Sequence, residues 1–407
     1  MIRFHNMKTN NNIPQGYKNS PLGIIPQEWE VKKLGDVAES FSGGTPKAGN
    51  NEYYGGNIPF IRSGEIHQKN TALFLSELGL AESSAKIVEK GDLLIALYGA
   101  NSGDSAISQI NGAINQAILC IRPYNLLTSF LCSFLELKKN MYVAKYLQGG
   151  QGNLSGDIVN NYIIPIPPLP EQQKIAEVLG TWDKAIEKQT QLIEKLELRK
   201  KGLMQQLLTG KKRLPGFSEE WKDVKLGTLF IERNEINRAN LPLLSITADR
   251  GVIFQSESDK RDISNDDKSK YKRICPNDIG YNTMRMWQGR CALSSLEGIV
   301  SPAYSIITPN KDVNPHYMEM LFKQPFTMYC FWTHSQGLVS DTLNCKFHDF
   351  SQIKVTIPSL KEQNAISYLF MEINHEIDVC TRQLNLLYQE KKGLMQVLLT
   401  GKKRVTQ

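Results

Sequence analysis

Two nearly identical stretches determine how this chain is organised. The first, KKGLMQQLLTGKKR, covers residues 200–213, and the second, KKGLMQVLLTGKKR, covers residues 391–404. They agree at 13 of 14 positions with an offset of 191 residues, an agreement that chance does not produce. The period is far longer than that of a solenoid repeat, so the pattern indicates a single two-fold duplication.

The duplication continues upstream of both stretches. At the same offset, IPIPPLPEQ (164–172) aligns with VTIPSLKEQ (355–363), and earlier still Trp29 followed by KLG aligns with Trp221 followed by KLG. Between these matches the halves differ almost completely, apart from a weak echo of GAINQAILCIRP in GIVSPAYSIITP. The chain therefore alternates a variable domain, a shared segment, a second variable domain and a second shared segment.

Each shared segment has the pattern of one long helix. Proline-rich residues open both segments, and Gly210 and Gly401 close them, as is typical of helix starts and ends. Apolar residues alternate at spacings of four and three, which is the a and d seam of a coiled coil, for over four heptads. The first series is Ile175, Leu179, Trp182, Ile186, Gln189, Ile193, Leu196, Lys200, Leu203 and Leu207, and the second is Ile366, Phe370, Ile373, Ile377, Cys380, Leu384, Leu387, Lys391, Leu394 and Leu398.

A helix of this length cannot bury its apolar seam alone. The two helices either pack against each other in antiparallel orientation or pair with helices of another chain. Lys200 and Lys391 both occupy seam positions, and antiparallel packing would keep these like charges apart. We therefore favour an antiparallel pair within the chain.

The variable domains have mixed α and β patterns. Short strand-like runs cover residues 93–99, 117–123, 243–247 and 303–309. The stretches SFLCSFLELKKNMYVAKYL and HYMEMLFKQPFTMYCFW are helical in pattern, and Pro325 interrupts the second. Together with the long helices, these patterns predict an α+β fold.

The composition is that of an ordinary globular protein. The chain has 407 residues, of which 41% are hydrophobic and 22% charged, so we expect two or three domains. No uncharged apolar run approaches the roughly eighteen residues of a membrane helix, and the N-terminus lacks the apolar core of a signal peptide, so we expect a cytoplasmic protein. None of the seven cysteines forms a CxxC pair, which favours reduced, mostly buried thiols over a zinc site.

The basic surplus lies mainly in the shared segments. The net charge is +7. Residues 1–165 carry 14 basic and 13 acidic side chains, and residues 214–357 carry 17 of each. Residues 166–213 carry 10 against 6, and residues 358–407 carry 7 against 5. The charge permits an acidic partner, but any grip on it must come from local basic faces.

No motif of a catalytic site is found. The nearest is Asn314-Pro315-His316-Tyr317, which differs from the N-P-P-Y motif of adenine methyltransferases and follows no glycine-rich cofactor loop. Asparagine followed by proline more simply caps the next helix. The Glu136–Lys138 pair has no upstream Pro-Asp partner of a nuclease, and the six histidines show no metal-ligand spacing.

Two loops combine residues that suit DNA. Residues 43–47 (GGTPK) offer a flexible backbone, a hydroxyl and a cation, and residues 284–290 (MRMWQGR) offer two arginines, an amide and an aromatic ring. Arginine can bind guanine bidentately, glutamine or asparagine can bind adenine, and hydroxyls and lysines suit phosphates. Ordinary surface turns are the alternative interpretation.

Taken together, these features resemble the specificity subunit of a type I restriction–modification enzyme. The resemblance covers nearly the whole chain from about Ser20. It rests on the duplicated openings Ile164–Gln172 and Val355–Gln363 and on the helices that close in LLTGKKR. GGTP and YYGGNIPFI in the first half, and YNTMRMWQG and GIVSPAY in the second, are also similar to the family's target recognition domains.

The resemblance implies two mixed α/β target recognition domains separated by two long antiparallel helices, in a pseudo-two-fold circular arrangement. The expected divisions are a flexible N-terminal segment (1–20), target recognition domain 1 (21–165), a central helix (166–213), target recognition domain 2 (214–357), and a C-terminal helix with a basic tail (358–407).

The resemblance further implies that the chain is a non-catalytic subunit of a larger enzyme. Each recognition domain would read one half of a split double-stranded DNA target, and the helices would set the gap between the halves. Two modification subunits would bind S-adenosylmethionine and methylate adenine, and two restriction subunits would use ATP and Mg²⁺. The chain itself would bind no cofactor or metal and would not contact a membrane.

Two groups of residues are candidates for these contacts. The candidates for DNA contact are Thr45, Lys47, Asn101, Gln116, Arg285, Trp287, Gln288 and Arg290, of which Trp287 could equally pack in the domain. Met204, Leu208, Met395 and Leu399 recur off the seam, which suits one partner bound at two equivalent places; packing against the neighbouring recognition domain is the alternative.

Two other classes of function stay open at this point. A fused methyltransferase or nuclease would need a cofactor loop, and isolated chain that neither binds S-adenosylmethionine nor cuts DNA would argue against it. A coiled-coil scaffold without DNA binding would be excluded if the chain, with its modification subunit, is retained on duplex DNA.

Overall fold

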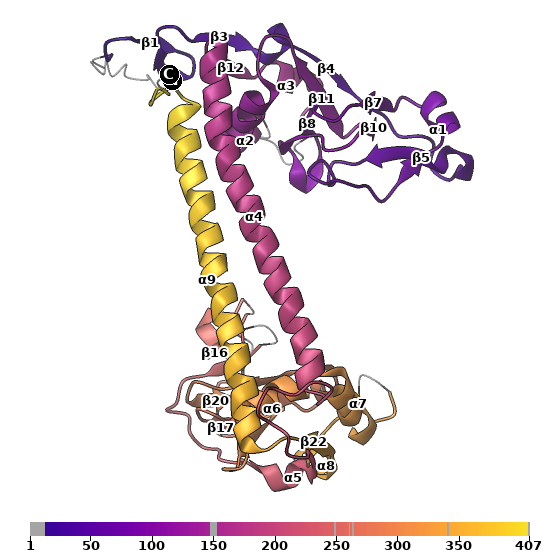
Figure 1. Ribbon diagram of the computed structural model, residues 1–407, viewed down its shortest axis with the longest axis vertical. Helices are drawn as coiled ribbons and strands as arrows, with labels where there is room; N and C mark the ends of the chain where they lie inside the picture. Colours follow the sequence, from indigo (N-terminus) through magenta and orange to yellow (C-terminus); the bar gives the residue numbers. More distant parts are fainter. Residues whose placement is uncertain are drawn as a thin grey trace. The chain divides into compact units, whose positions relative to one another are not determined.

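The computed structural model describes residues 13–146, 153–247, 250–259, 261–262, 264–339 and 342–405. Two compact units are present, residues 1–190 with 382–407 (unit 1) and residues 191–381 (unit 2). We call residues 21–165 variable domain 1 and residues 214–357 variable domain 2. Each unit holds one variable domain and about half of each long helix (Figure 1).

Antiparallel sheets form most of variable domain 1. The main sheet has the strand order β4-β11-β8-β9, a second has the order β6-β5-β10-β7 with β5 and β10 parallel, and β12 pairs with β3. The strands are β1 (Tyr17–Ser20), β2 (Gly23–Pro26), β3 (Glu30–Lys33), β4 (Ala38–Ser42), β5 (Tyr54–Ile61), β6 (Phe74–Leu75), β7 (Lys86–Val88), β8 (Leu93–Ala96), β9 (Ser105–Ile107), β10 (Gly112–Ile114), β11 (Ile118–Pro123) and β12 (Ile163–Ile166). The helical elements are η1 (Leu34–Asp36), η2 (Asn51–Tyr53), α1 (Glu77–Ala81), η3 (Gly99–Asn101), α2 (Thr128–Tyr146) and α3 (Gly156–Asn160).

Variable domain 2 has a smaller version of the same arrangement. Its main sheet has the order β14-β21-β18-β19, with the pairs β17–β20, β15–β16 and β13–β22 beside it. The strands are β13 (Lys222–Lys225), β14 (Phe230–Glu232), β15 (Leu244–Ile246), β16 (Val252–Phe254), β17 (Lys272–Ile274), β18 (Ile279–Asn282), β19 (Cys291–Leu293), β20 (Gly298–Val300), β21 (Tyr304–Pro309) and β22 (Lys354–Ile357). The helical elements are α5 (Leu226–Leu229), η4 (Gln255–Glu257), η5 (Met286–Gln288), α6 (Pro315–Phe322), α7 (Pro325–His334) and α8 (Phe347–Gln352), and the two long helices are α4 (Leu169–Leu207) and α9 (Leu360–Leu398).

Five consecutive strands recur in the two domains with a constant offset. Strands β7 to β11 have the same lengths as β17 to β21, and each is displaced by 186 residues. The strand register recurs as well, because Leu93 pairs with Ile121 and Ile279 pairs with Ile307. The domains therefore share one strand framework, although the sequence echo covers only its last two strands.

An aspartate occupies the same place in both frameworks, half-buried in the first and buried in the second. The carboxylate of Asp92 accepts hydrogen bonds from the guanidinium of Arg122 at 2.9 and 2.7 Å and from the backbone N–H of Glu89. Asp278, 186 residues later, accepts from Arg233, which directly follows β14, whereas Arg122 lies in β11. The carboxylate fixes the turn before the central strand, so the framework persists while the surrounding sequence varies.

The two long helices pack in antiparallel orientation. In unit 1, Asp183 of α4 forms an ion pair with Lys391 of α9 at 2.8 Å, and Gln189 donates a hydrogen bond to Gln383 at 3.2 Å. Residue numbers rise along α4 as they fall along α9, which defines the orientation. The intramolecular, antiparallel arrangement favoured above is confirmed.

The seam predicted from the spacing forms the contact between these helices. Its apolar members are buried or half-buried, whereas off-seam residues such as Leu198, Leu386 and Tyr388 are exposed. The fully buried members are Ile175, Leu179, Ile186, Leu196 and Leu207 in α4, and Ile366, Phe370, Ile373, Ile377, Cys380 and Leu398 in α9. The seam also continues into the cores of the variable domains, which joins each domain to its helices.

Other expectations from the sequence are met in part. The structure has α2 where one helix was expected, and Pro325 separates α6 from α7. Cys120, Cys291 and Cys345 are buried thiols, and burial raises the pKa of each to about 12. The segment expected to be flexible, 1–20, lies outside the described residues as far as residue 12, and its last four residues form β1.

Candidate nucleic-acid interface

The first candidate loop lies directly against a strand of variable domain 1. A Cβ on Gly43 would lie 1.8 Å from the carbonyl oxygen of Ile114, so only glycine allows this approach. The backbone N–H of Gly44 donates to the same carbonyl at 3.2 Å. This packing brings Thr45 to Gln116, whose side-chain oxygen accepts a hydrogen bond from the threonine hydroxyl at 2.5 Å.

Thr45 and Gln116 are both exposed, so they form a small polar site at the surface. Lys47 follows two residues later and is also exposed. Asn101 is half-buried at the end of η3, in a different loop. Within the described part of the chain, no hydrogen bond joins Lys47 or Asn101 to the Thr45–Gln116 pair. The structure therefore brings together two of these four candidates.

Three candidates of variable domain 2 line a single cavity. Arg285, Gln288 and Arg290 surround a volume of about 380 Å³ at one end of the main sheet. The loop reverses direction at Gly289, whose φ of +71° is in the left-handed region. The rest of the lining is Ile246, Thr247, Asn282 and Tyr304.

Trp287 behaves differently from its neighbours in this loop. Its indole N–H donates to the carbonyl oxygen of Met284 at 3.1 Å, and its ring packs against the core of unit 2. It is half-buried and does not line the cavity of Arg285 and Arg290. The geometry thus supports packing over base contact, and base contact by Trp287 stays a prediction without structural support.

The burial of the candidate docking residues corrects their proposed role. Leu208, Met395 and Leu399 are 2%, 4% and 0% exposed and belong to the cores of their units, while Met204 is half-buried against the same core. A partner cannot reach the buried three without opening the fold. They recur because each variable domain packs on its helix end in the same way, which was the alternative interpretation.

A duplicated cluster of three side chains closes each unit. In unit 1, Glu171 accepts hydrogen bonds from the indole N–H of Trp29 at 2.9 Å and from the guanidinium of Arg404 at 2.6 and 3.0 Å. Glu171 is 7% exposed, and the pKa of Arg404 is raised by these hydrogen bonds. The cluster connects the start of variable domain 1, the start of α4 and the end of the repeat.

Unit 2 contains the same cluster. Glu362 accepts from Trp221 at 3.3 Å and from Arg213 at 2.6 and 2.5 Å. Sequence reasoning did not assign a role to these residues, although Trp, Glu and Arg all belong to the matching anchors of the repeat. Their identity in both halves is explained by this shared contact.

The glutamine after each glutamate attaches a variable domain to its helix. The side-chain oxygen of Gln172 accepts from the backbone N–H of Leu127 at 2.7 Å, just before α2. The side-chain oxygen of Gln363 accepts from the N–H of Asn314 at 3.0 Å, just before α6. Both residues of the Glu-Gln motif therefore have structural roles. The glutamate binds the Trp and Arg side chains of its cluster, and the glutamine binds the backbone of the variable domain.

Asn314 has a structural role as well. Its side chain caps α6 by accepting from the backbone N–H of Tyr317 at 2.9 Å, with Pro315 in the first turn. Ser367 of α9 donates to the same oxygen at 3.0 Å. The capping interpretation of Asn-Pro-His-Tyr is confirmed.

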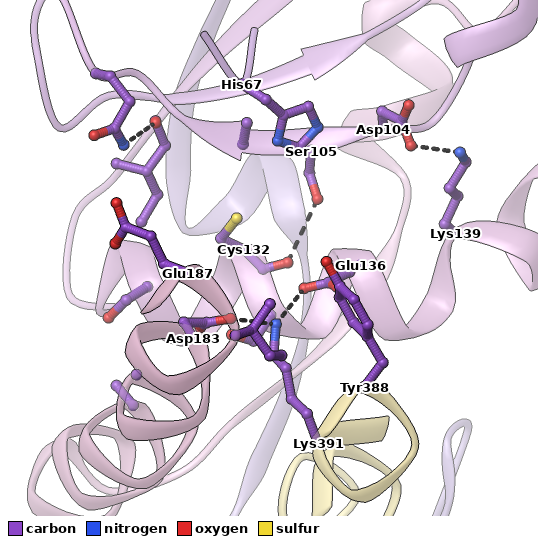
Figure 2. Close-up of a pocket in the computed structure, with 18 of the residues that line it drawn as sticks. His67, Asp104, Ser105, Cys132, Glu136, Lys139, Asp183, Glu187, Tyr388 and Lys391 are labelled. Carbon is purple, nitrogen blue, oxygen red and sulfur yellow. Dashed lines mark hydrogen bonds and ion pairs between the residues drawn. The ribbon is translucent and has the colours of Figure 1, made fainter. Parts of the chain in front are cut away.

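A cavity of about 660 Å³ lies between variable domain 1 and the two helices within unit 1. Figure 2 shows Lys391 pointing from α9 toward carboxylates of α4 and α2. Its ammonium lies 2.8 Å from Asp183 and 3.3 Å from Glu136. Burial acts to lower the pKa of Lys391, but the two carboxylates more than offset this and the pKa is raised.

The other charges around this cavity are also paired. Lys139 pairs with Asp104 (Figure 2). Lys69 pairs with Glu187 at 3.5 Å. Ion pairs that cross from the domain to the helices fit a joint better than a ligand site. No group of three His, Cys, Asp or Glu side chains that could hold a metal ion occurs within the part of the chain that is described.

Comparison with known proteins is consistent with this geometry. Residues 26–198 match the model of a family described as Type I restriction modification DNA specificity domain. The Type I restriction enzyme MjaVIII specificity subunit of Methanocaldococcus jannaschii is 24% identical over 414 residues, 94% of each protein, and the MjaIX specificity subunit of that organism is 32% identical over 194 residues, 45% of each. The crystal structure of a type I restriction–modification S subunit from M. genitalium has a TM-score of 0.57 at 14% identity, over 98% of this chain and 99% of that one.

These similarities concern one class of protein. Residues 26–198 are similar to the DNA specificity domain of type I restriction–modification systems, and most of the chain is similar to a specificity subunit of a type I restriction enzyme. The described helices of this chain include none that is both long and apolar enough to cross a membrane.

Proposed function

We propose that this chain supplies the DNA sequence specificity of a type I restriction–modification complex. The observation that carries the proposal is one strand framework used twice with unrelated loops. Five strands keep their lengths and spacing, while the loop between the second and third strands is Leu97–Asp104 in one domain and Thr283–Arg290 in the other. A conserved framework with different loops suits two domains that read two different sequences.

The candidate contacts with DNA follow from exposure and chemistry. In variable domain 1 the exposed Thr45–Gln116 pair would meet the DNA, with Lys47 beside it suited to phosphate and Asn101 suited to a base edge. In variable domain 2, Arg285, Gln288 and Arg290 would contact the DNA. Trp287 would support the loop that carries them. These loops would read the DNA sequence, while partner subunits would supply much of the electrostatic attraction to the DNA phosphates.

The partners and cofactors of the complex follow from the family. Two modification subunits would bring S-adenosylmethionine and methylate adenine, and two restriction subunits would bring ATP and Mg²⁺. This chain would bind the double-stranded target without a catalytic site of its own. The two half-sites would be read by the two variable domains, and the paired helices would set the gap between them.

The docking surface for modification subunits should lie on exposed members of the repeat. Lys201 and Gln205 are exposed on one face of α4, and Lys392 and Gln396 are their exposed counterparts on α9. Charge reversal at both lysines should release modification subunits without unfolding the chain. If both changes leave the complex intact, docking on this face is wrong.

Strand-resolved mapping of methyladenine tests the proposed function directly. The chain and its modification subunit would be expressed in a host that lacks DNA methylation at the site. We expect one split motif with a fixed gap, and exchange of residues 40–160 for those of a relative should change one half of that motif only. A contiguous motif, or methylation that persists without this chain, would contradict the proposal.

A further inference from the structure

The cavity of variable domain 2 is lined by hydrogen-bond donors. Asn282 lies at the end of β18, Arg285 and Gln288 lie in the following loop, Arg290 lies just before β19, and Tyr304 begins β21. Thr247, after β15, completes the polar lining. Three separate segments therefore contribute polar groups to one space of about 380 Å³.

Most acceptors around this cavity are already used by the fold. The side-chain oxygen of Asn282 accepts from the N–H of Met284 at 3.0 Å, and the hydroxyl of Thr247 donates to Gly251 and accepts from Arg250. Burial raises the pKa of Tyr304, which keeps this phenol neutral. No aspartate or glutamate is among the residues that line the cavity.

This donor-rich lining selects what can enter. Guanine offers two acceptors, O6 and N7, in the major groove, and an arginine can bind both at once. Cytosine presents an amino donor there, and a guanidinium group cannot accept a hydrogen bond from it. We propose that variable domain 2 reads at least one guanine of its half-site through this cavity, with Arg285 or Arg290 as the bidentate donor. The proposal rests on the function proposed above.

The corresponding place in variable domain 1 has different chemistry. At the constant offset of 186 residues, Arg285, Gln288 and Arg290 correspond to Gly99, Ser102 and Asp104. Asp104 forms an ion pair with Lys139, and the other two offer no guanidinium. We therefore expect this loop to read guanine in variable domain 2 but not in variable domain 1.

The test uses the complex of the chain with its modification subunit and its mapped target duplex. Each guanine of that half-site is replaced in turn by 7-deazaguanine, which lacks the N7 acceptor but still pairs with cytosine. We expect one replacement to weaken binding by about 5- to 150-fold, the range of a good bidentate contact. In Arg285→Ala or Arg290→Ala, whichever removes the contact, the same replacement should have no further effect.

Two further variants separate base reading from a charge effect. Arg→Lys at the same position keeps the charge but loses the planar fork, so it should not restore discrimination of guanine. Arg238→Ala removes a charge from the same domain outside the cavity and should leave the effect of 7-deazaguanine unchanged. A phosphate contact would instead be rescued by lysine and would weaken all sequences alike.

Three results would overturn the inference: a half-site without guanine, no response to 7-deazaguanine, or an arginine effect that is equal on all sequences. In each of these cases the complex would still methylate a split target, so the proposed function would stand. If no split target exists, the proposed function itself fails first.

Discussion

Gly401, near the end of the chain, lies directly against Pro26, near its beginning. A Cβ on Gly401 would lie 2.3 Å from Cδ of Pro26 and 3.4 Å from the ring of Trp29. Gly210 lies against Trp221 in the same manner, at 3.4 Å. Since Arg404 also reaches Glu171, the last repeat stretch meets variable domain 1 as the first one meets variable domain 2. The last repeat stretch and the first strands of the chain are therefore in contact, although no peptide bond connects them.

Circular permutation should therefore preserve recognition. A chain in which Gln407 is joined to Met1, and which opens in the exposed turn between Pro215 and Gly216, should fold and give the same methylation pattern. Mapped methyladenine would be compared with that of the original chain. A permutant opened within β21, between Ile306 and Ile307, is the control that should fail to fold.

The two closing glycines differ in a way that can be measured. Gly210 and Gly401 both have φ of +69°, so alanine at either position should cost about 1–2 kcal/mol. Gly401→Ala additionally meets Pro26 below contact distance, whereas Gly210→Ala meets Trp221 at an ordinary one. Hydrogen exchange should show a larger loss of protection around Gly401 than around Gly210. Equal losses would mean that Pro26 can move aside at no cost.

Lys391 of α9 forms ion pairs with both α4 and variable domain 1 at the joint between them. Lys391 is 8% exposed, and Lys391→Met should destabilise unit 1 by about 1–2 kcal/mol, because Asp183 and Glu136 lose their shared cation but remain half-exposed to water. Lys200→Met is the matched control. Among the residues that the structure describes, Lys200 pairs only with Glu197 of its own helix, at 3.6 Å, so that change should fall within about 0.5 kcal/mol.

Thermal unfolding and hydrogen exchange of α2 would measure the difference between the two variants. High salt should reduce the advantage of the original chain over Lys391→Met, because the carboxylates are accessible to ions. If Lys391→Met and Lys200→Met behave alike, the ion pairs seen across the joint contribute no stability.

The helices were predictable from the sequence, and most of the binding loops were not. The seam from Ile175 to Leu207 has a strict period, so its pattern fixes both the helix and its buried face. The partner and orientation needed a second argument, the like charges of Lys200 and Lys391. The fold class followed from these helices together with short strand-like runs.

The candidate sites needed tertiary structure. Arg285 and Arg290 were chosen by residue type, but the cavity that they share forms only when β15, β18 and β21 come together. Met395 and Leu399 were predicted as docking residues because they recur in the repeat, but both are buried. Repetition at a helix end does not distinguish a docking face from a core. The common strand framework was nearly invisible, since it preserves spacing and register rather than residue identity.

The last prediction concerns the length of the paired helices. Each has 39 residues, which gives about 58 Å at roughly 1.5 Å per residue and limits the separation of half-site centres to about 17 base pairs. Four residues would be inserted after Leu198 and four after Glu376, which the antiparallel register places opposite each other and which are both exposed. Four residues make a stutter that keeps the apolar seam nearly continuous. The variable domains should separate by up to about 6 Å, so both half-sites should be retained with a gap longer by roughly one or two base pairs.

Mapping of methyladenine in DNA from hosts that express each variant measures the gap. Insertion in α4 alone is the control, because one longer helix puts the seam out of register with its partner and should reduce methylation without creating a new gap. The paired insertion restores the match and should restore activity at the new spacing. Normal activity at the original gap in the paired variant would mean that these helices do not set the spacing, and the distance between half-sites would then have to be fixed by the modification subunits.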